Sequence, residues 1–134
     1  IASYHGIPKK YFDKGDPYHC YCHKTTRLIS EKFSSIKIKT TFQSRFGPQE
    51  WLQPYTDKTL EKLGDEKVAS LALMAPGFSA DCLETLEELA MEGQESFHEH
   101  GGGQFDYVPC LNASEPGMAV IRQIVDENLS GWVK

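Results

Sequence analysis

The sequence has 134 residues, enough for one domain with a hydrophobic core of its own. Its hydrophobic fraction of 40% and charged fraction of 25% are typical of globular proteins in water. The net charge of −5 argues against nucleic acid as a partner, because no basic patch is present to neutralise phosphates. No signal peptide, lipidation motif or long apolar run occurs, which predicts a cytoplasmic protein.

The first element in the chain is a short strand over residues 1–4, which places His5 at its carboxyl end. Because the strand pattern is already under way at the first residue, we interpret the sequence as part of a longer protein. A helix is predicted over residues 18–33. Its expected inward-facing side chains are Leu28, Ile29 and Phe33.

A second strand is predicted over residues 36–44, where β-branched residues alternate with polar ones. The segment that follows holds Arg45, Phe46 and Trp51 between glycine and proline breaks, and such loops carry function more often than packing. A short helix is expected to begin at Thr56 and to end at a glycine.

The apolar run over residues 68–75 predicts a buried third strand, followed by a loop and an acidic helix. Asp81 and Glu84 have the spacing of a capping box at the start of that helix, which we expect to extend to His100. A strand, loop and helix in this order place the loop at the carboxyl edge of a parallel sheet, where ligands of open α/β domains bind.

The remaining pattern predicts a fourth strand over residues 105–111, with Pro109 indicating an edge of the sheet. A last helix is expected to open at Pro116. Its predicted apolar face consists of Val120, Ile121, Ile124, Val125 and Leu129. The alternation of strands and helices predicts a three-layer, Rossmann-like α/β domain with a four-stranded parallel sheet.

Glu84, Glu88 and Glu92 are spaced to lie along one face of the acidic helix. One interpretation is a solvated acidic face with a capping residue at its start. The other is a site, because His5 is predicted to reach the same sheet edge, and a histidine facing a carboxylate can accept protons or bind a borderline metal such as ferrous iron. The residues alone leave both open. We expect burial and like charge to raise the carboxylate pKa values.

Other histidines and cysteines receive simpler interpretations. Cys20 and Cys22, with His19 and His23, match no common zinc spacing, so we favour ordinary helix-start residues. The pair His98 and His100 suits a helix C-terminus. Since no phosphate-binding glycine loop follows the first strand and no nucleophile elbow occurs, nucleotide binding and hydrolysis are disfavoured. No organic cofactor is predicted.

Several segments together resemble the ferrochelatase family, whose members insert ferrous iron into a porphyrin. They are residues 3–8 (SYHGIP), 15–18 (GDPY), 41–47 (TFQSRFG), 51–56 (WLQPYT), 76–78 (PGF), 81–88 (DCLETLEE) and 111–112 (LN). These segments span almost the whole chain in order. The resemblance identifies residues 1–134 as the C-terminal α/β domain of such an enzyme, a lyase of haem biosynthesis, with the N-terminal domain absent.

The resemblance implies a catalytic pair, His5 as proton acceptor and Glu84 as its acidic partner, both also candidate metal ligands. Asp81, Glu88 and Glu92 would form a path for protons or the metal. The expected porphyrin contacts are Trp51, Phe46 and Tyr55. Cys82 departs from animal members, which carry a histidine there.

Ferrous iron is therefore the expected metal substrate, and protoporphyrin IX the expected porphyrin. The missing domain would supply the opposite wall of the cleft, so we expect the isolated chain to be inactive. It could also carry an apolar lip for peripheral contact with the inner membrane. An iron–sulfur cluster is neither predicted nor excluded. The alternatives are a related chelatase for another metal or tetrapyrrole, and a noncatalytic α/β binding module in which Asp81 and Glu84 form only a helix cap.

Overall fold

The computed structural model describes residues 1–132 around a four-stranded sheet in which all neighbouring strands are parallel. The strands are β1 (Ala2–His5), β2 (Thr40–Gln43), β3 (Ser70–Met74) and β4 (Gln104–Val108), in the spatial order β2-β1-β3-β4. The predicted four-stranded parallel sheet is confirmed, and β4 lies at an edge as Pro109 indicated. β1 has the predicted length but ends one residue later, whereas β2, β3 and β4 are shorter than predicted.

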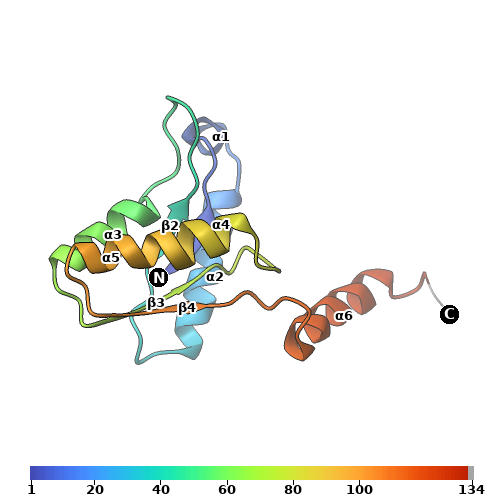
Figure 1. Ribbon diagram of the computed structural model, residues 1–134. Coiled ribbons are helices and arrows are strands. Elements are labelled where there is room, and N and C mark those ends of the chain that lie inside the picture. Colours follow the sequence, from blue (N-terminus) through green and yellow to red (C-terminus); the bar gives the residue numbers. More distant parts are fainter. Residues whose placement is uncertain (133–134) are drawn as a thin grey trace.

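Helices cover both faces of this sheet, which confirms the three-layer α/β arrangement (Figure 1). In chain order they are α1 (Lys9–Asp13), α2 (Tyr18–Lys32), α3 (Thr56–Asp65), α4 (Leu83–Thr85), the π-helical η1 (Leu86–Glu92), α5 (Gly93–Glu99) and α6 (Glu115–Leu129). α3 packs beside α5 on one face, and α2 lies on the other. Within residues 1–132, no helix combines the length and apolar character that crossing a bilayer requires.

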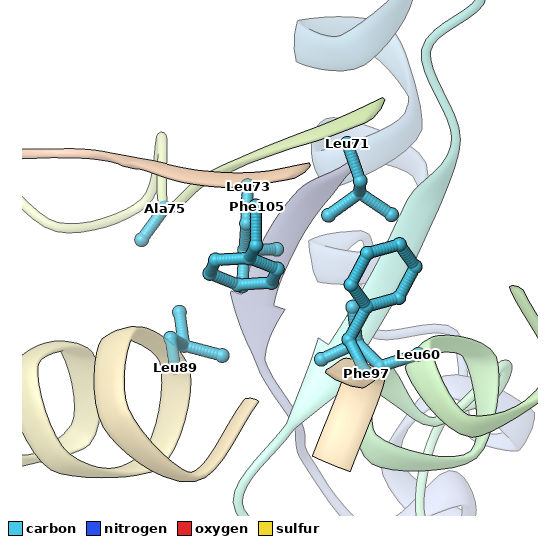
Figure 2. Close-up of a cluster of buried hydrophobic side chains, with 7 residues drawn as sticks. All are labelled: Leu60, Leu71, Leu73, Ala75, Leu89, Phe97 and Phe105. Atoms are coloured by element: carbon cyan, nitrogen blue, oxygen red, sulfur yellow. The ribbon is translucent and has the colours of Figure 1, made fainter. Parts of the chain in front are cut away.

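Two hydrophobic clusters lie between the sheet and its helices. The larger one, drawn in Figure 2, joins β3 and β4 to α3, η1 and α5 through Leu60, Leu71, Leu73, Ala75, Leu89, Phe97 and Phe105. The second joins β1 and β2 to α2 through Ala2, Tyr4, Cys22, Phe42 and Leu52. Since side chains alternate along a strand, Ala2 and Tyr4 of β1 face α2, whereas Ser3 and His5 face the helices on the opposite side.

The inward face of α2 differs from the prediction. Leu28 and Phe33 are exposed and Ile29 is half-buried, whereas the buried residues of this helix are Cys22 and Thr26. The hydroxyl of Thr26 makes hydrogen bonds of 3.1 Å with the Tyr4 hydroxyl and 2.9 Å with that of Thr40. These hydrogen bonds allow a polar residue to be buried on the inner side of α2. The spacing of apolar residues in the sequence therefore did not predict which side of the helix is buried.

The helix α6 begins where predicted, and Ser114 caps it by accepting a hydrogen bond from the Gly117 N–H at 3.2 Å. However, α6 extends away from the sheet (Figure 1). The five side chains of its predicted apolar face are between 41% and 54% exposed. The helical spacing is therefore confirmed, but this face is not part of the core in the structure.

Candidate functional site

The strand order creates a topological switch point between β1 and β3. After β1 the chain crosses to β2 on one side of the sheet, and after β3 it crosses to β4 on the other. Loops leaving such neighbouring strands diverge and leave a crevice at the carboxyl edge. His5 ends β1, and the loop after β3 leads to the helical turn that carries Glu84. The predicted site edge therefore coincides with the crevice of the fold.

His5 is half-buried and oriented by its own backbone neighbourhood. Its Nδ1 lies 2.7 Å from the carbonyl oxygen of Gly6, which can only accept, so this nitrogen carries the proton in the neutral ring. The hydroxyl of Tyr18 donates to the His5 carbonyl at 2.8 Å. This tautomer leaves a lone pair on Nε2, and the imidazole can therefore act as a base through that atom.

Gly6 permits a close approach behind His5. A side chain at this position would place its Cβ 2.9 Å from the carbonyl oxygen of Gln43 and 3.2 Å from Cε3 of Trp51. The indole therefore packs directly against the backbone that holds His5. Trp51 is only 8% exposed, and its Nε1 donates to the carbonyl of Phe46 at 3.0 Å.

Glu84 does not take part in the predicted capping box. The N–H of Cys82 donates instead to the Thr85 hydroxyl at 2.9 Å, and the N–H of Asp81 donates to Asn112 Oδ1 at 2.8 Å. Residue Cys82, not Asp81, is the N-cap of α4. Thr85 fills the third helical position and satisfies the cap, which leaves the Glu84 carboxylate available at the crevice.

The expectation of raised carboxylate pKa values is wrong for Glu84 and Asp81. A hydrogen bond from the Cys82 side chain lowers the pKa of Glu84. The imidazole of His5, when it is positively charged, lowers this pKa further by electrostatic attraction. Burial opposes ionisation of Asp81, but hydrogen bonds from Asn112 and Tyr107 lower its pKa to about 2. Donors around each carboxylate outweigh its limited burial, so both are ionised at neutral pH.

Gln43 connects β2 to the acidic helix. It pairs with His5 in the register of the sheet, and its Nε2 donates to the Glu84 carbonyl at 2.7 Å. Its Oε1 accepts from the Ser3 hydroxyl at 2.9 Å. The next residue, Ser44, donates to the carboxylate of Glu88 through its N–H at 2.7 Å and through its hydroxyl. The end of β2 thus fixes two positions of the helix.

A cavity of about 620 Å³ lies between the loop after β2, α3 and the helix formed by α4, η1 and α5. Glu84, Glu87, Glu88 and Glu92 contribute carboxylates to its lining. On the opposite wall, the Arg45 guanidinium binds the Asp57 carboxylate at 2.9 and 2.7 Å. The three glutamates predicted to share one helix face, Glu84, Glu88 and Glu92, therefore line one space.

Glu87 lines this cavity as well as Glu88, since residues three and four positions after Glu84 share its helix face, and Glu87 was not among the site residues predicted from the sequence. His5 and Trp51 do not line this cavity. The carboxylates therefore reach from the crevice near His5 into a separate acidic space.

Of the three aromatic residues predicted to contact the porphyrin, one ring is exposed and two are covered by other groups of the protein. Phe46 is 66% exposed and meets the Trp51 ring edge-on, with centroids 5.9 Å apart. The Tyr55 ring is covered by the Arg45 guanidinium, 4.3 Å from its centroid. Of the three, Phe46 offers the largest free apolar surface to a flat ligand.

The remaining histidines and cysteines make packing contacts or have free thiols. All four cysteines have free thiols. His19 and His23 pack their rings together with centroids 4.4 Å apart, and His19 stacks on Phe42. Across residues 1–132, no group of three or more His, Cys, Asp or Glu side chains is arranged to hold a metal ion.

Sequence reasoning missed Gln43, Ser44 and Tyr107 as contributors to the site. The signal available for Gln43 and Ser44 was their place at the end of a predicted strand, beside the loop already singled out. Tyr107 reaches Asp81 from β4, and no local pattern predicts a contact between those positions.

Comparison with protein families shows that residues 1–129 match the family profile described as Ferrochelatase. A curated relative named Ferrochelatase from Mesorhizobium japonicum is 60% identical over 99% of this chain. Those of Rhizobium meliloti and Agrobacterium fabrum are each 56% identical over 99% of the chain. The chain spans 38%, 40% and 39% of the length of these three relatives, respectively.

Proposed function

This chain belongs to the ferrochelatase family, and on that basis we propose that the full-length protein inserts ferrous iron into protoporphyrin IX in the last step of haem biosynthesis. The observation that carries this proposal is the orientation of two groups at the switch point. Hydrogen bonding to Gly6 leaves the Nε2 lone pair of His5 free, and Thr85 satisfies the helix cap in place of Glu84.

Metal insertion must release two protons, because each metalloporphyrin forms with loss of both pyrrole N–H hydrogens. We assign His5 as their acceptor through Nε2, one proton at a time. Each protonation creates an imidazolium, which the ionised carboxylate of Glu84 stabilises by charge. His5 and Glu84 are also the nitrogen and oxygen donors that would contact the ferrous ion during insertion, a set that suits this borderline metal.

The acidic cavity supplies a route for charge between solvent and the crevice. Glu84, Glu88 and Glu92 line it, and the backbone and hydroxyl of Ser44 hold Glu88 in place. We propose that these carboxylates attract ferrous ions and lead released protons outward. We leave Asp81 out of this route, because three donors of the protein already occupy its Oδ1.

For the porphyrin, we propose a binding wall that includes Phe46, Trp51 and Tyr55. Phe46 would contact the macrocycle, whereas Trp51 supports the backbone at Gly6 and His5. The portion of the relatives that this chain does not match would supply the opposite wall. We further propose a cytoplasmic location in which that portion makes peripheral contact with the inner membrane.

The experiment follows loss of free-porphyrin fluorescence when ferrous iron is added anaerobically to the full-length protein. We compare the wild type with His5→Ala and Glu84→Gln, after circular dichroism shows that each is folded. Glu95→Gln is the matched control, since Glu95 is exposed and outside the cavity lining. Loss of insertion in both site variants, by roughly 100-fold or more, is the expected result.

Two outcomes would contradict the proposal in different ways. Insertion of zinc or cobalt without insertion of iron would identify a chelatase for another metal. Tight porphyrin binding without insertion of any metal by the wild type would identify a noncatalytic binding module.

A further inference from the structure

The carboxylate of Asp81 is surrounded by four hydrogen-bond donors. Its Oδ1 accepts from the Tyr107 hydroxyl at 2.9 Å, the Thr85 hydroxyl at 3.1 Å and the Cys110 N–H at 3.3 Å. Its Oδ2 accepts from Asn112 Nδ2 at 2.7 Å. An ionised carboxylate has about two lone-pair sites on each oxygen, so Oδ1 is fully occupied and Oδ2 keeps one accepting position.

The contact with Asn112 is reciprocal. The N–H of Asp81 donates to Asn112 Oδ1 at 2.8 Å, and the N–H of Asn112 donates to the Ser79 carbonyl at 2.9 Å. Asn112 adopts a left-handed backbone with φ of 52°, a conformation that asparagine tolerates better than most residues. The loop after β3 and the loop after β4 are therefore joined through both backbone and side chains.

This connection between the two loops, made by Asp81 and Asn112, extends to the helical turn that carries Glu84. The Thr85 hydroxyl that donates to Asp81 also accepts from the Cys82 N–H, and Thr85 is fully buried. Asp81 and Thr85 thus flank Glu84 in sequence and hold each other in space. A shift of Asp81 would be transmitted to the first helical turn.

We propose that Asp81 is a positioning residue that ties the loop after β3 to Asn112 and Tyr107, and that it is not a step in the proton or metal route. The proposal rests on the proposed function, because what Asp81 positions is the carboxylate of Glu84. A metal or proton could bind Oδ1 of Asp81 only by displacing one of its three donors, and at Oδ2 it would share the oxygen with Asn112. The hydrogen bonds also lower the pKa of Asp81 to about 2 despite the cost of burial, so the carboxylate is ionised near neutral pH.

A swap of the two side chains tests this assignment in the full-length protein. In Asp81→Asn, one carboxylate oxygen becomes an amide nitrogen, which then faces either Asn112 Nδ2 or the Cys110 N–H, so two donors meet in either orientation. In the double variant Asp81→Asn with Asn112→Asp, the pair regains one donor and one acceptor, although the hydrogen bond from Asn112 to the Cys110 carbonyl at 3.0 Å is lost. The swap therefore restores this connection without restoring a carboxylate at position 81.

We expect Asp81→Asn to lower kcat for iron insertion roughly 10- to 100-fold, since small displacements of catalytic groups have effects of that size. The swap should recover about half of this loss or more on a logarithmic scale. Tyr107→Phe, which keeps every carboxylate, should also lower kcat. The pH dependence of kcat should keep its shape in all variants. Asp106→Asn, an exposed neighbour on β4, is the matched control.

A double variant as inactive as Asp81→Asn, together with a fully active Tyr107→Phe, would overturn the proposal and return Asp81 to the route. Amide hydrogen exchange over residues 79–86 gives a second reading that does not depend on activity. If the wild type inserts no metal, the proposed function fails. The positioning role of Asp81 is then still supported if amide exchange over these residues is faster in Asp81→Asn than in the wild type and slower in the double variant than in Asp81→Asn. Unchanged exchange in both variants would overturn it.

Discussion

The side chain of Gln43 donates to the backbone carbonyl of Glu84 at 2.7 Å and so joins the end of β2 to the first turn of the acidic helix. Gln43 is itself the register partner of His5. One buried amide therefore relates the two residues assigned to proton transfer, although they lie on separate elements.

Replacement of Gln43 by Met, which has similar length and no hydrogen-bonding group, should leave the Glu84 carbonyl and the Ser3 hydroxyl without this partner. We expect a loss of about 1–3 kcal/mol in the free energy of unfolding and a fall in kcat of roughly tenfold. Urea unfolding and porphyrin fluorescence assays measure the two effects. Unchanged kcat in a destabilised variant would limit Gln43 to a structural role.

Gly6 offers a second test of how closely the site is packed. Gly6→Ala would place a methyl group 2.9 Å from the Gln43 carbonyl and 3.2 Å from Trp51. We expect a loss of about 1–3 kcal/mol in the free energy of unfolding, because neither the backbone of Gln43 nor the buried ring of Trp51 can move away without disturbing the packing. The control is Gly77→Ala, whose new Cβ would meet Tyr4 at an ordinary 3.4 Å. Equal thermal midpoints for both variants would contradict the packing described around His5.

Strand ends were predictable from sequence because apolar runs, breakers and parallel order determine where a crevice forms. This logic placed His5 and Glu84 at one edge before any contact was known. Local pattern could not give the inner face of α2, where Thr26 is buried through hydrogen bonds. The apolar spacing of α6 correctly predicted a helix, but a helical pattern does not show which part of a protein covers its apolar face.

The capping box failed for a related reason. Asp81 and Glu84 have the right spacing, but Asp81 is occupied by Tyr107 and Asn112 from a distant part of the chain. Long-range partners compete with local ones, and local sequence does not show them. The π-helical turn of η1 lies equally outside what helical spacing can predict.

The exposed ring of Phe46 and the buried ring of Trp51 predict opposite kinds of defect. Phe46→Ala should change the free energy of unfolding by no more than about 0.5 kcal/mol and raise KM for the porphyrin several-fold. Trp51→Ala should cost about 3–5 kcal/mol of stability. Thermal unfolding and porphyrin titration of both variants separate these effects. A strongly destabilised Phe46→Ala would contradict the exposed position of this ring.

Asp81 should also contribute to acid sensitivity. Its folded-state pKa is about 2, below the ordinary aspartate value of 3.8, so its stabilising contribution is present above pH 3.8 and is lost as pH falls toward 2. The wild type should therefore lose stability in this window, and Asp81→Asn should show a flatter dependence there. Urea midpoints between pH 2 and 5 measure the slope. Parallel curves for the two proteins would show that the carboxylate gains no net stabilisation from its donors.

The acidic cavity predicts a metal-dependent defect that is separate from proton transfer. Glu92 lines the cavity, whereas Glu95, three residues later on the same helix, is exposed outside it. Because Glu92 would act on the approaching ion by charge, Glu92→Gln should raise KM for ferrous iron several-fold and leave KM for porphyrin unchanged. Raising the salt concentration should reduce the difference from wild type, since screening weakens the same attraction. Glu95→Gln should match the wild type in all three measurements, and an equal rise in KM for iron in both variants would assign the effect to general surface charge.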